Sequence, residues 1–306
     1  MNLTNAMVSW SHPAKGVWLD NLWQFDYRGT TVLVGDTALA AEVAASRFWF
    51  GDAKKELFRK AVSDLLNHTA EFLFCGWPEV VECVILRGAD HVRPSNMSEL
   101  IRRKAIRTAP RFKRKDDAQG VWTANLYEEE SENLGQLFRA NRVLIEDGCG
   151  AGGSTGVGVL RLLKSRNPNF TMATFLCPIM GDIALKRTVA EADRLNVKLT
   201  VVCFGVYRVL PVGWNGKTDT DIIIPVDDGE IASSDILAIP DRQIRAYHSL
   251  YQPKNGRGPC LVGDVGESMS DDSKEVASYV QMTVEEWREF CGTPVPDSLL
   301  TAASRS

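Results

Sequence analysis

The stretch RVLIEDGCGAGGSTGVGVLRLL, residues 142–163, carries the pattern from which the fold class of this chain can be inferred. It begins with an apolar run typical of a buried strand and continues through a loop of small residues, after which helical periodicity predicts a helix over residues 154–166. The acidic residues Glu146 and Asp147 stand where the strand ends. A strand, a glycine-rich loop and a helix form the first half of a crossover unit, so the stretch predicts a parallel sheet.

The sequence on both sides continues this alternation of strands and helices. Helical spacing of apolar residues predicts a helix over residues 52–74, and the apolar run Val80–Leu86 predicts a buried strand. Farther along, strands are predicted in TMATFLCP and VKLTVVCFG, with a helix over GDIALKRTVAEADRLN between them. We therefore expect an α/β fold whose mainly parallel, twisted sheet is flanked by helices.

Composition limits the classes of function. The chain has 306 residues, 44% hydrophobic and 24% charged, as in an ordinary globular protein with a sizeable core. A net charge of −4 argues against a nucleic-acid or membrane-surface partner. The 7 cysteines form no CxxC pair, which favours reduced, buried thiols and a cytoplasmic protein. No signal-peptide core and no apolar run of the roughly 20 residues that span a membrane is present.

Two kinds of site are compatible with the glycines of the opening stretch. GCGAG looks like the turn that binds the methyl donor in methyltransferases, whereas EDGCGAGGS looks like an acidic pair before a phosphate loop. A methyltransferase strand is apolar up to its first glycine, and burying the unpaired carboxylates of Glu146 and Asp147 would be costly. That class also needs an acid at the end of the next strand, where Cys177 and Pro178 stand. An S-adenosylmethionine-dependent methyltransferase is the alternative that fits less well.

The phosphate-loop interpretation has its parts in the required order. In open parallel sheets, ligands lie beyond the carboxyl ends of the strands. Here a loop would present backbone N–H groups and two hydroxyls at a helix start, which suits a phosphate. This phosphate loop consists of Gly150, Ala151, Gly152, Gly153, Ser154 and Thr155. Because Glu146 and Asp147 can bind a sugar diol or the water on a bound Mg²⁺, we expect a site for a 5-phosphosugar.

VLIEDGCGAGGS resembles the phosphoribosyl-pyrophosphate signature of type I phosphoribosyltransferases, and its GGS ending resembles the uracil phosphoribosyltransferase branch. Ala151 stands where the family usually has threonine, so one hydroxyl contact to the 5-phosphate is missing. VILRGADHV, residues 84–92, is similar to the pyrophosphate loop of that branch. GPCLVGDVGESM, residues 258–269, is similar to its base-recognition stretch, and the three segments follow in the expected order.

The resemblance implies a transferase that moves 5-phosphoribose from phosphoribosyl pyrophosphate to a uracil-like or other small heterocyclic base and releases pyrophosphate. It implies Mg²⁺ bound mainly through the pyrophosphate, with no protein ligand to the metal directly assigned, and a homodimer. Such a reaction needs fixed geometry, screening of the departing charge and exclusion of water.

The resemblance also implies residue roles. Arg87 would bind pyrophosphate together with the backbone of Gly88 and Ala89, and Glu146 and Asp147 would hold the ribose hydroxyls, so that Arg87 and this acidic pair are the expected catalytic residues. The basic stretch of residues 102–115 lies where the family has a flexible loop that closes over the leaving group; its candidates are Arg107, Arg111 and Lys113. The expected base-binding residues are Gly263, Asp264, Val265, Gly266 and Glu267.

We expect the chain to be organised in four segments. They are an N-terminal extension packed on the core (1–51), the phosphoribosyltransferase-like core (52–205), an insert plus base-recognition hood (206–291), and a C-terminal tail (292–306). Two further functions stay open. A non-catalytic regulator would bind phosphoribosyl pyrophosphate without turnover, which Ala151 favours, and a partner subunit would use residues 206–257 as an interaction surface.

Overall fold

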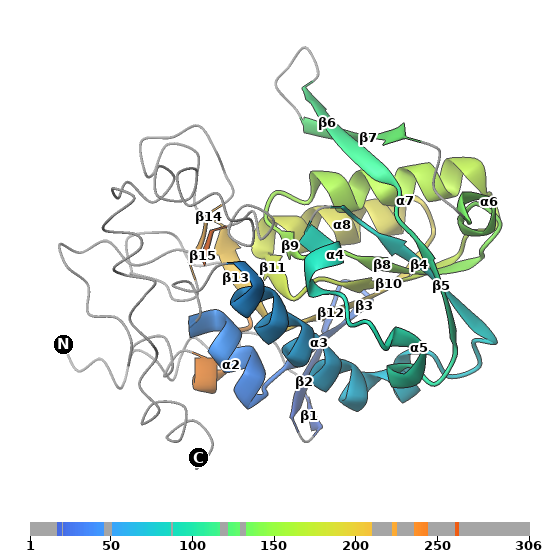
Figure 1. Ribbon diagram of the computed structural model, residues 1–306. Coiled ribbons are helices and arrows are strands. Elements are labelled where there is room, and N and C mark those ends of the chain that lie inside the picture. The colour runs from blue at the N-terminus through green and yellow to red at the C-terminus, as the bar shows by residue number, and fades with distance from the viewer. Residues whose placement is uncertain are drawn as a thin grey trace.

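The computed structural model has an eight-stranded main sheet (Figure 1). The structure describes residues 17–19, 21–45, 51–86, 88–116, 122–128, 133–209, 222–224, 236–243 and 261–262. The strand order is β1-β2-β3-β12-β10-β8-β4-β5. These strands are β1 Val17–Leu19, β2 Leu22–Tyr27, β3 Thr30–Gly35, β4 Glu79–Val84, β5 Lys104–Thr108, β8 Arg142–Glu146, β10 Met172–Leu176 and β12 Lys198–Cys203. All neighbours from β3 to β5 are parallel, so the predicted α/β fold with a mainly parallel sheet is confirmed.

Helices cover both faces of this sheet, and the alternation of side chains along β8 shows how. Leu144 belongs to the apolar cluster under α3, whereas Val143 and Ile145 point to the other face and pack with α7 and α8. Because both faces are covered, the central strands are apolar throughout, as in other parallel sheets. The helices are α2 Ala38–Ala45, α3 Gly51–Leu73, α4 Gly88–Val92, α5 Met97–Leu100, α6 Leu134–Leu137, α7 Ser154–Arg166 and α8 Asp182–Arg194.

A second sheet continues the first beyond its carboxyl edge. Its strands β9, β11 and β13 follow shortly after β8, β10 and β12, and they pair in parallel. The sheet has the order β15-β14-β13-β11-β9, with β9 Cys149–Gly150, β11 Ile179–Gly181, β13 Gly205–Val209, β14 Ile222–Ile224 and β15 Leu261–Val262. The loops at the carboxyl ends of the main strands are therefore held between two sheets.

A separate two-stranded ribbon projects from the body of the molecule (Figure 1). It pairs β6, Arg111–Asp116, with β7, Trp122–Glu128, in antiparallel register. β7 lies against α7, so the ribbon stands beside the helix that follows the phosphate loop.

The predicted elements of the core are confirmed, and the N-terminal region adds strands that sequence reasoning did not place. Helix α7 covers the predicted residues 154–166, and α3 and α8 lie within a few residues of prediction. Within the expected extension of residues 1–51, β2 and β3 form a hairpin whose two turn residues, Arg28 and Gly29, have φ of 52° and 79°. This turn matches the twist of the strands, and β3 then joins β12.

No helix in the described parts of the chain is both long and apolar enough to cross a membrane.

Candidate functional site

The candidate site lies where β4 and β8 end at the carboxyl edge of the main sheet. The N–H of Ile85 donates to the carbonyl of Glu146 at 2.9 Å, which holds the chain after β4 against the end of β8. A Cβ atom on Gly148 would lie 2.8 Å from the carbonyl carbon of Gly88. Only glycine permits so close an approach. The expected pyrophosphate loop and the expected ribose-binding residues are thus brought side by side.

The expected phosphate loop surrounds the start of α7. Gly153 is the N-cap, with φ of 76°, and no side chain caps the helix. A Cβ atom there would lie 2.8 Å from the Cα of Ala184, so the loop packs on α8 through this glycine. The guanidinium of Arg187 donates to the carbonyl of Gly152 at 2.9 Å. The first N–H groups of α7 have no partner within an α-helix, and they open beside the half-buried Ser154 and Thr155.

Ala151 packs into the core instead of lining the edge of the site. It is only 6% exposed and belongs to the same apolar cluster as Ile179 and Val209. A side chain at this position therefore points away from the helix start. The polar groups available there are the backbone N–H groups and the hydroxyls of the next residues.

The two acids expected to act together occupy different environments. Asp147 is half-buried beside Gly88, whereas Glu146 is only 2% exposed and lies inside the protein. Because Glu146 is paired with Val84 of β4, and Glu82 stands two positions earlier in that strand, both glutamates face the same side of the sheet. Glu82 is fully buried as well.

One arginine, Arg93, contacts both carboxylates of this buried glutamate pair. Its Nη2 lies 2.6 Å from Oε2 of Glu82, and its Nε lies 3.8 Å from Oε1 of Glu146. One oxygen of each carboxylate, Oε1, has no hydrogen-bond partner among the residues that the structure describes. Burial raises the pKa of Glu146 well above its ordinary value, and the charge of Glu82 raises it further, while Arg93 lowers it. Burial likewise raises the pKa of Glu82, again opposed by Arg93.

Sequence reasoning missed Glu82, Arg93 and Asp90. Arg107 of β5 stands opposite Glu82 in the sheet and forms an ion pair with Asp90 of α4. The signal that could have found the cluster is the glutamate in the middle of EVVECV, since a charged residue within a buried strand needs a partner. The partner comes from HVRP, just after the expected pyrophosphate loop.

Comparison with known proteins adds little to this geometry. The sequence matches no family model and no curated protein. Among solved structures, one similar chain is a hypothetical protein from Neisseria gonorrhoeae with bound ppGpp, at 12% identity and a TM-score of 0.31. The similarity covers 55% of this chain and 88% of that one. A likeness this weak carries no argument about fold or ligand.

The expected flexible loop of residues 102–115 has a different form from the one predicted. Residues 104–108 form β5, because Ile106 and Thr108 alternate with more exposed residues and bury their side chains against the sheet. Residues 111–116 form β6, which pairs with β7. Arg107 is thus a strand residue at the edge of the main sheet. Arg111 and Lys113 lie on β6, and their side chains are outside the described part.

The remaining expected residues lie outside the residues that the structure describes. They are Arg87, which would bind pyrophosphate, and the base-binding residues Gly263, Asp264, Val265, Gly266 and Glu267. Within the described parts, no group of three or more histidine, cysteine, aspartate or glutamate side chains could hold a metal ion. Ala89, two residues after Arg87, is buried in α4.

Proposed function

We propose that this chain is a phosphoribosyltransferase of the type I family, nearest to the uracil branch. The observation that carries the proposal is the contact of Gly88 with Gly148. Two segments far apart in sequence, each similar to a phosphate-binding segment of that family, meet at the carboxyl edge of a parallel sheet. Ligands of open α/β sheets bind at this edge.

The substrate, phosphoribosyl pyrophosphate, fits the order of the segments around that contact. Its 5-phosphate would lie on the N–H groups at the start of α7, its ribose beside Asp147, and its diphosphate over residues 86–89, where Arg87 can bind it bidentately. The base would be held by residues 263–267. The β6–β7 ribbon, which lies against α7, stands where the family's flexible loop is expected, and in this proposal it would cover the site.

Asp147 takes the ribose contact in this proposal, and Glu146 supports it from inside. The Glu146 carboxylate is buried and paired with Arg93, whereas Asp147 is partly accessible. In the reaction a ring nitrogen of the base bonds to C1 of the ribose and releases its N–H proton to solvent, while the C1–O bond to pyrophosphate breaks and its electron pair leaves with pyrophosphate. Mg²⁺, bound by the substrate's diphosphate, would neutralise part of that charge, and Asp147 can accept hydrogen bonds from its water ligands.

The protein chain's own contribution is positioning and exclusion of water. The loop from Gly150 to Thr155 fixes the phosphosugar, and the donors after β4 fix the leaving group. We further propose a cytoplasmic homodimer, on the family resemblance and on the cysteine content. A regulator that binds the same sugar without turnover is the second candidate, but Ala151 no longer favours it, since its side chain points into the core.

The test uses the intact chain with phosphoribosyl pyrophosphate, Mg²⁺ and a panel of pyrimidine and purine bases. Calorimetry measures binding of the sugar, and a coupled assay measures pyrophosphate release. We expect both, and we expect Asp147→Asn to lower release at least tenfold while Glu79→Gln, an exposed acid at the other end of β4, has no effect. Binding without release from any base would identify the regulator. Neither binding nor release would refute the proposal.

A further inference from the structure

Arg187 of α8 reaches the phosphate loop from the neighbouring helix. Helices α7 and α8 lie side by side (Figure 1), and both begin at the carboxyl edge of the main sheet. Because the side chains of an α-helix tilt towards its N-terminus, Arg187 can extend back towards that edge. Its guanidinium donates to the carbonyl of Gly152 at 2.9 Å, across 35 positions of sequence. The fold, and not the local chain, therefore makes this contact.

The contact fixes the direction of one backbone N–H group. In a planar trans peptide the C=O and the next N–H point in opposite directions. Since the carbonyl of Gly152 faces Arg187, the N–H of Gly153 points away from α8. Helix α8 leads from β10 to β12, whereas Asp147 and Gly88 follow β8 and β4, which lie in the opposite direction along the strand order. The N–H of Gly153 is thus directed to the side of the molecule where the candidate site lies, and no described residue accepts a hydrogen bond from it.

The peptide between Gly152 and Gly153 is the part of the loop that can most easily turn over. Glycine on both sides removes the Cβ contacts that oppose rotation of a peptide plane. Gly153 packs on Ala184, so its Cα stays in place while the peptide before it can rotate. A rotated peptide would direct the carbonyl oxygen of Gly152 to the site, where its partial negative charge would repel a phosphate. The hydrogen bond from Arg187 opposes this rotation, and a charged donor makes it about twice as strong as a neutral one.

Arg187 differs from the other arginines of these two helices because no described acid engages it. It is exposed and makes no ion pair with any residue that the structure describes. Arg161 and Arg194, by contrast, are both engaged by Glu191. The phosphate loop has no charged side chain of its own. A cation that is bonded to the backbone of an uncharged loop fits a role towards an anion better than it fits surface ion pairing.

We propose that Arg187 is a positioning residue for the 5-phosphate of the phosphosugar. It holds the Gly152–Gly153 peptide with its N–H towards the phosphate, and its positive charge stabilises the carbonyl oxygen on the opposite side. The phosphate itself is bound by the backbone N–H groups of Gly153 and of the start of α7. The inference rests on the proposed function for the nature of the ligand. It assigns a task to a residue outside the three segments that resemble the phosphoribosyltransferase family.

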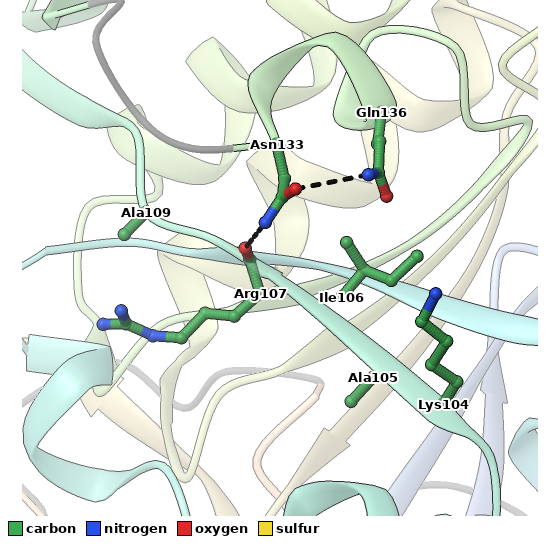
Figure 2. Close-up of a pocket in the computed structure, with 7 residues that line it drawn as sticks. All are labelled: Lys104, Ala105, Ile106, Arg107, Ala109, Asn133 and Gln136. Carbon is green, nitrogen blue, oxygen red and sulfur yellow. Dashed lines mark hydrogen bonds between the residues drawn. The ribbon is translucent and has the colours of Figure 1, made fainter.

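The experiment uses the intact chain and two variants of Arg187. Arg187→Met removes the donor and the charge, and Arg187→Lys retains a cationic donor. Arg139→Met is the matched control, because Arg139 is also exposed and donates to a glycine carbonyl, that of Gly135, at 2.8 Å. Arg139 follows Gln136, which lines a cavity along β5 at the end of the main sheet (Figure 2). Urea unfolding establishes that each variant is folded.

Calorimetry measures the binding of ribose 5-phosphate, which has the 5-phosphate alone, and of pyrophosphate with Mg²⁺, which is the leaving group alone. We expect Arg187→Met to weaken ribose 5-phosphate about tenfold, as for the loss of one hydrogen bond to a charged group, and to leave pyrophosphate binding unchanged. Arg187→Lys should restore most of the lost affinity, and Arg139→Met should match the wild type. In the pyrophosphate-release assay, Arg187→Met should raise the KM for phosphoribosyl pyrophosphate about tenfold with little change in kcat, because the 5-phosphate is bound alike in the ground state and the transition state.

The amide of Gly153 reports on the peptide itself. In NMR spectra of the chain labelled at glycine, its proton should shift downfield when the wild type is saturated with ribose 5-phosphate, and should not do so in Arg187→Met. A proton that shifts alike in both proteins overturns the positioning role.

The binding data separate this inference from the proposed function. Ribose 5-phosphate binding that Arg187→Met leaves unchanged overturns the inference and leaves the proposed function standing. Equal losses for ribose 5-phosphate and pyrophosphate also overturn it, because the whole site would then be disturbed, as does absence of ribose 5-phosphate binding by the wild type. Binding of ribose 5-phosphate that depends on Arg187, without pyrophosphate release from any base, supports the inference and counts against the proposed function alone.

Discussion

The buried glutamate pair makes a definite prediction about stability and pH. Glu82 and Glu146 are both almost fully buried, and Arg93 is the cation in contact with them. The next cation, Arg107, is engaged by Asp90. With both carboxylates ionised the cluster carries an excess negative charge, which one bound proton removes. Burial favours that proton, since it disfavours the charged form of each acid.

The sign and size of the effect follow from this count. The pKa of Glu146 in the folded protein lies above its ordinary value of 4.5, so between those two values the folded state binds more protons than the unfolded chain. The pair's contribution to stability is then most favourable near and below the ordinary value and declines as pH rises towards the folded-state pKa. One proton corresponds to a slope of about 1.4 kcal/mol per pH unit within that window.

Urea unfolding from about pH 5 to about pH 8 measures this slope for the wild type, for Glu146→Gln and for Glu79→Gln, an exposed control on the same strand. Glu146→Gln removes the ionisable group. Its free energy of unfolding should therefore rise relative to wild type as pH increases, by about 1.4 kcal/mol per pH unit within the window. The control should run parallel to the wild type. A difference between Glu146→Gln and wild type that does not change with pH would refute the reasoning.

Three further predictions concern the same framework. Arg93→Met leaves both buried carboxylates without their cation, so urea unfolding at neutral pH should show a loss of about 3–5 kcal/mol; a loss below about 1 kcal/mol would mean that another group compensates. Gly148→Ala places a Cβ atom 2.8 Å from the Gly88 carbonyl carbon. It should lower the free energy of unfolding by about 1–3 kcal/mol and weaken phosphoribosyl-pyrophosphate binding in calorimetry. The control Gly135→Ala, whose Cβ meets only a flexible guanidinium, should do neither. The pKa of Glu191 is lowered to about 2, first by hydrogen bonds from Arg161. Glu191→Gln should therefore destabilise fully above the ordinary value of 4.5, by no more than about 1 kcal/mol because the arginine is half-exposed, and the effect should fade as the pH falls towards about 2. Equal effects at neutral and strongly acidic pH in thermal unfolding would contradict this.

The core of the fold could be predicted because its signals are local. The glycines before Ser154 and the apolar periodicity after them define α7 over residues 154–166. Helical periodicity likewise defines α8, and short apolar runs define β10 and β12. The pairing of β3 with β12 could not be predicted in this way. The two strands are far apart in the sequence, and the residues of one strand do not indicate which distant strand it will pair with.

The basic stretch shows how charge can hide a strand. Arginine and lysine are so frequent in residues 102–115 that a solvated loop was expected, yet Ile106 and Thr108 alternate with exposed residues along β5. Period-two alternation of buried side chains outweighs the charge of their neighbours. Cations on an edge strand also discourage pairing with other chains, so the composition suits the position.

The two acids at the end of β8 lie in different environments, again because side chains alternate along a strand. The sequence alone predicts one shared role for Glu146 and Asp147, because they are adjacent. Adjacent residues at a strand end point to opposite sides, so adjacency argues against a common ligand contact unless the chain bends. Glu146 instead contacts Arg93, which follows the other loop of the site and also pairs with Glu82 in the strand before that loop. It thereby ties the two loops together from inside the protein. A substitution of Glu146 should therefore act on stability and on loop position, whereas one at Asp147 should act on the ribose contact itself.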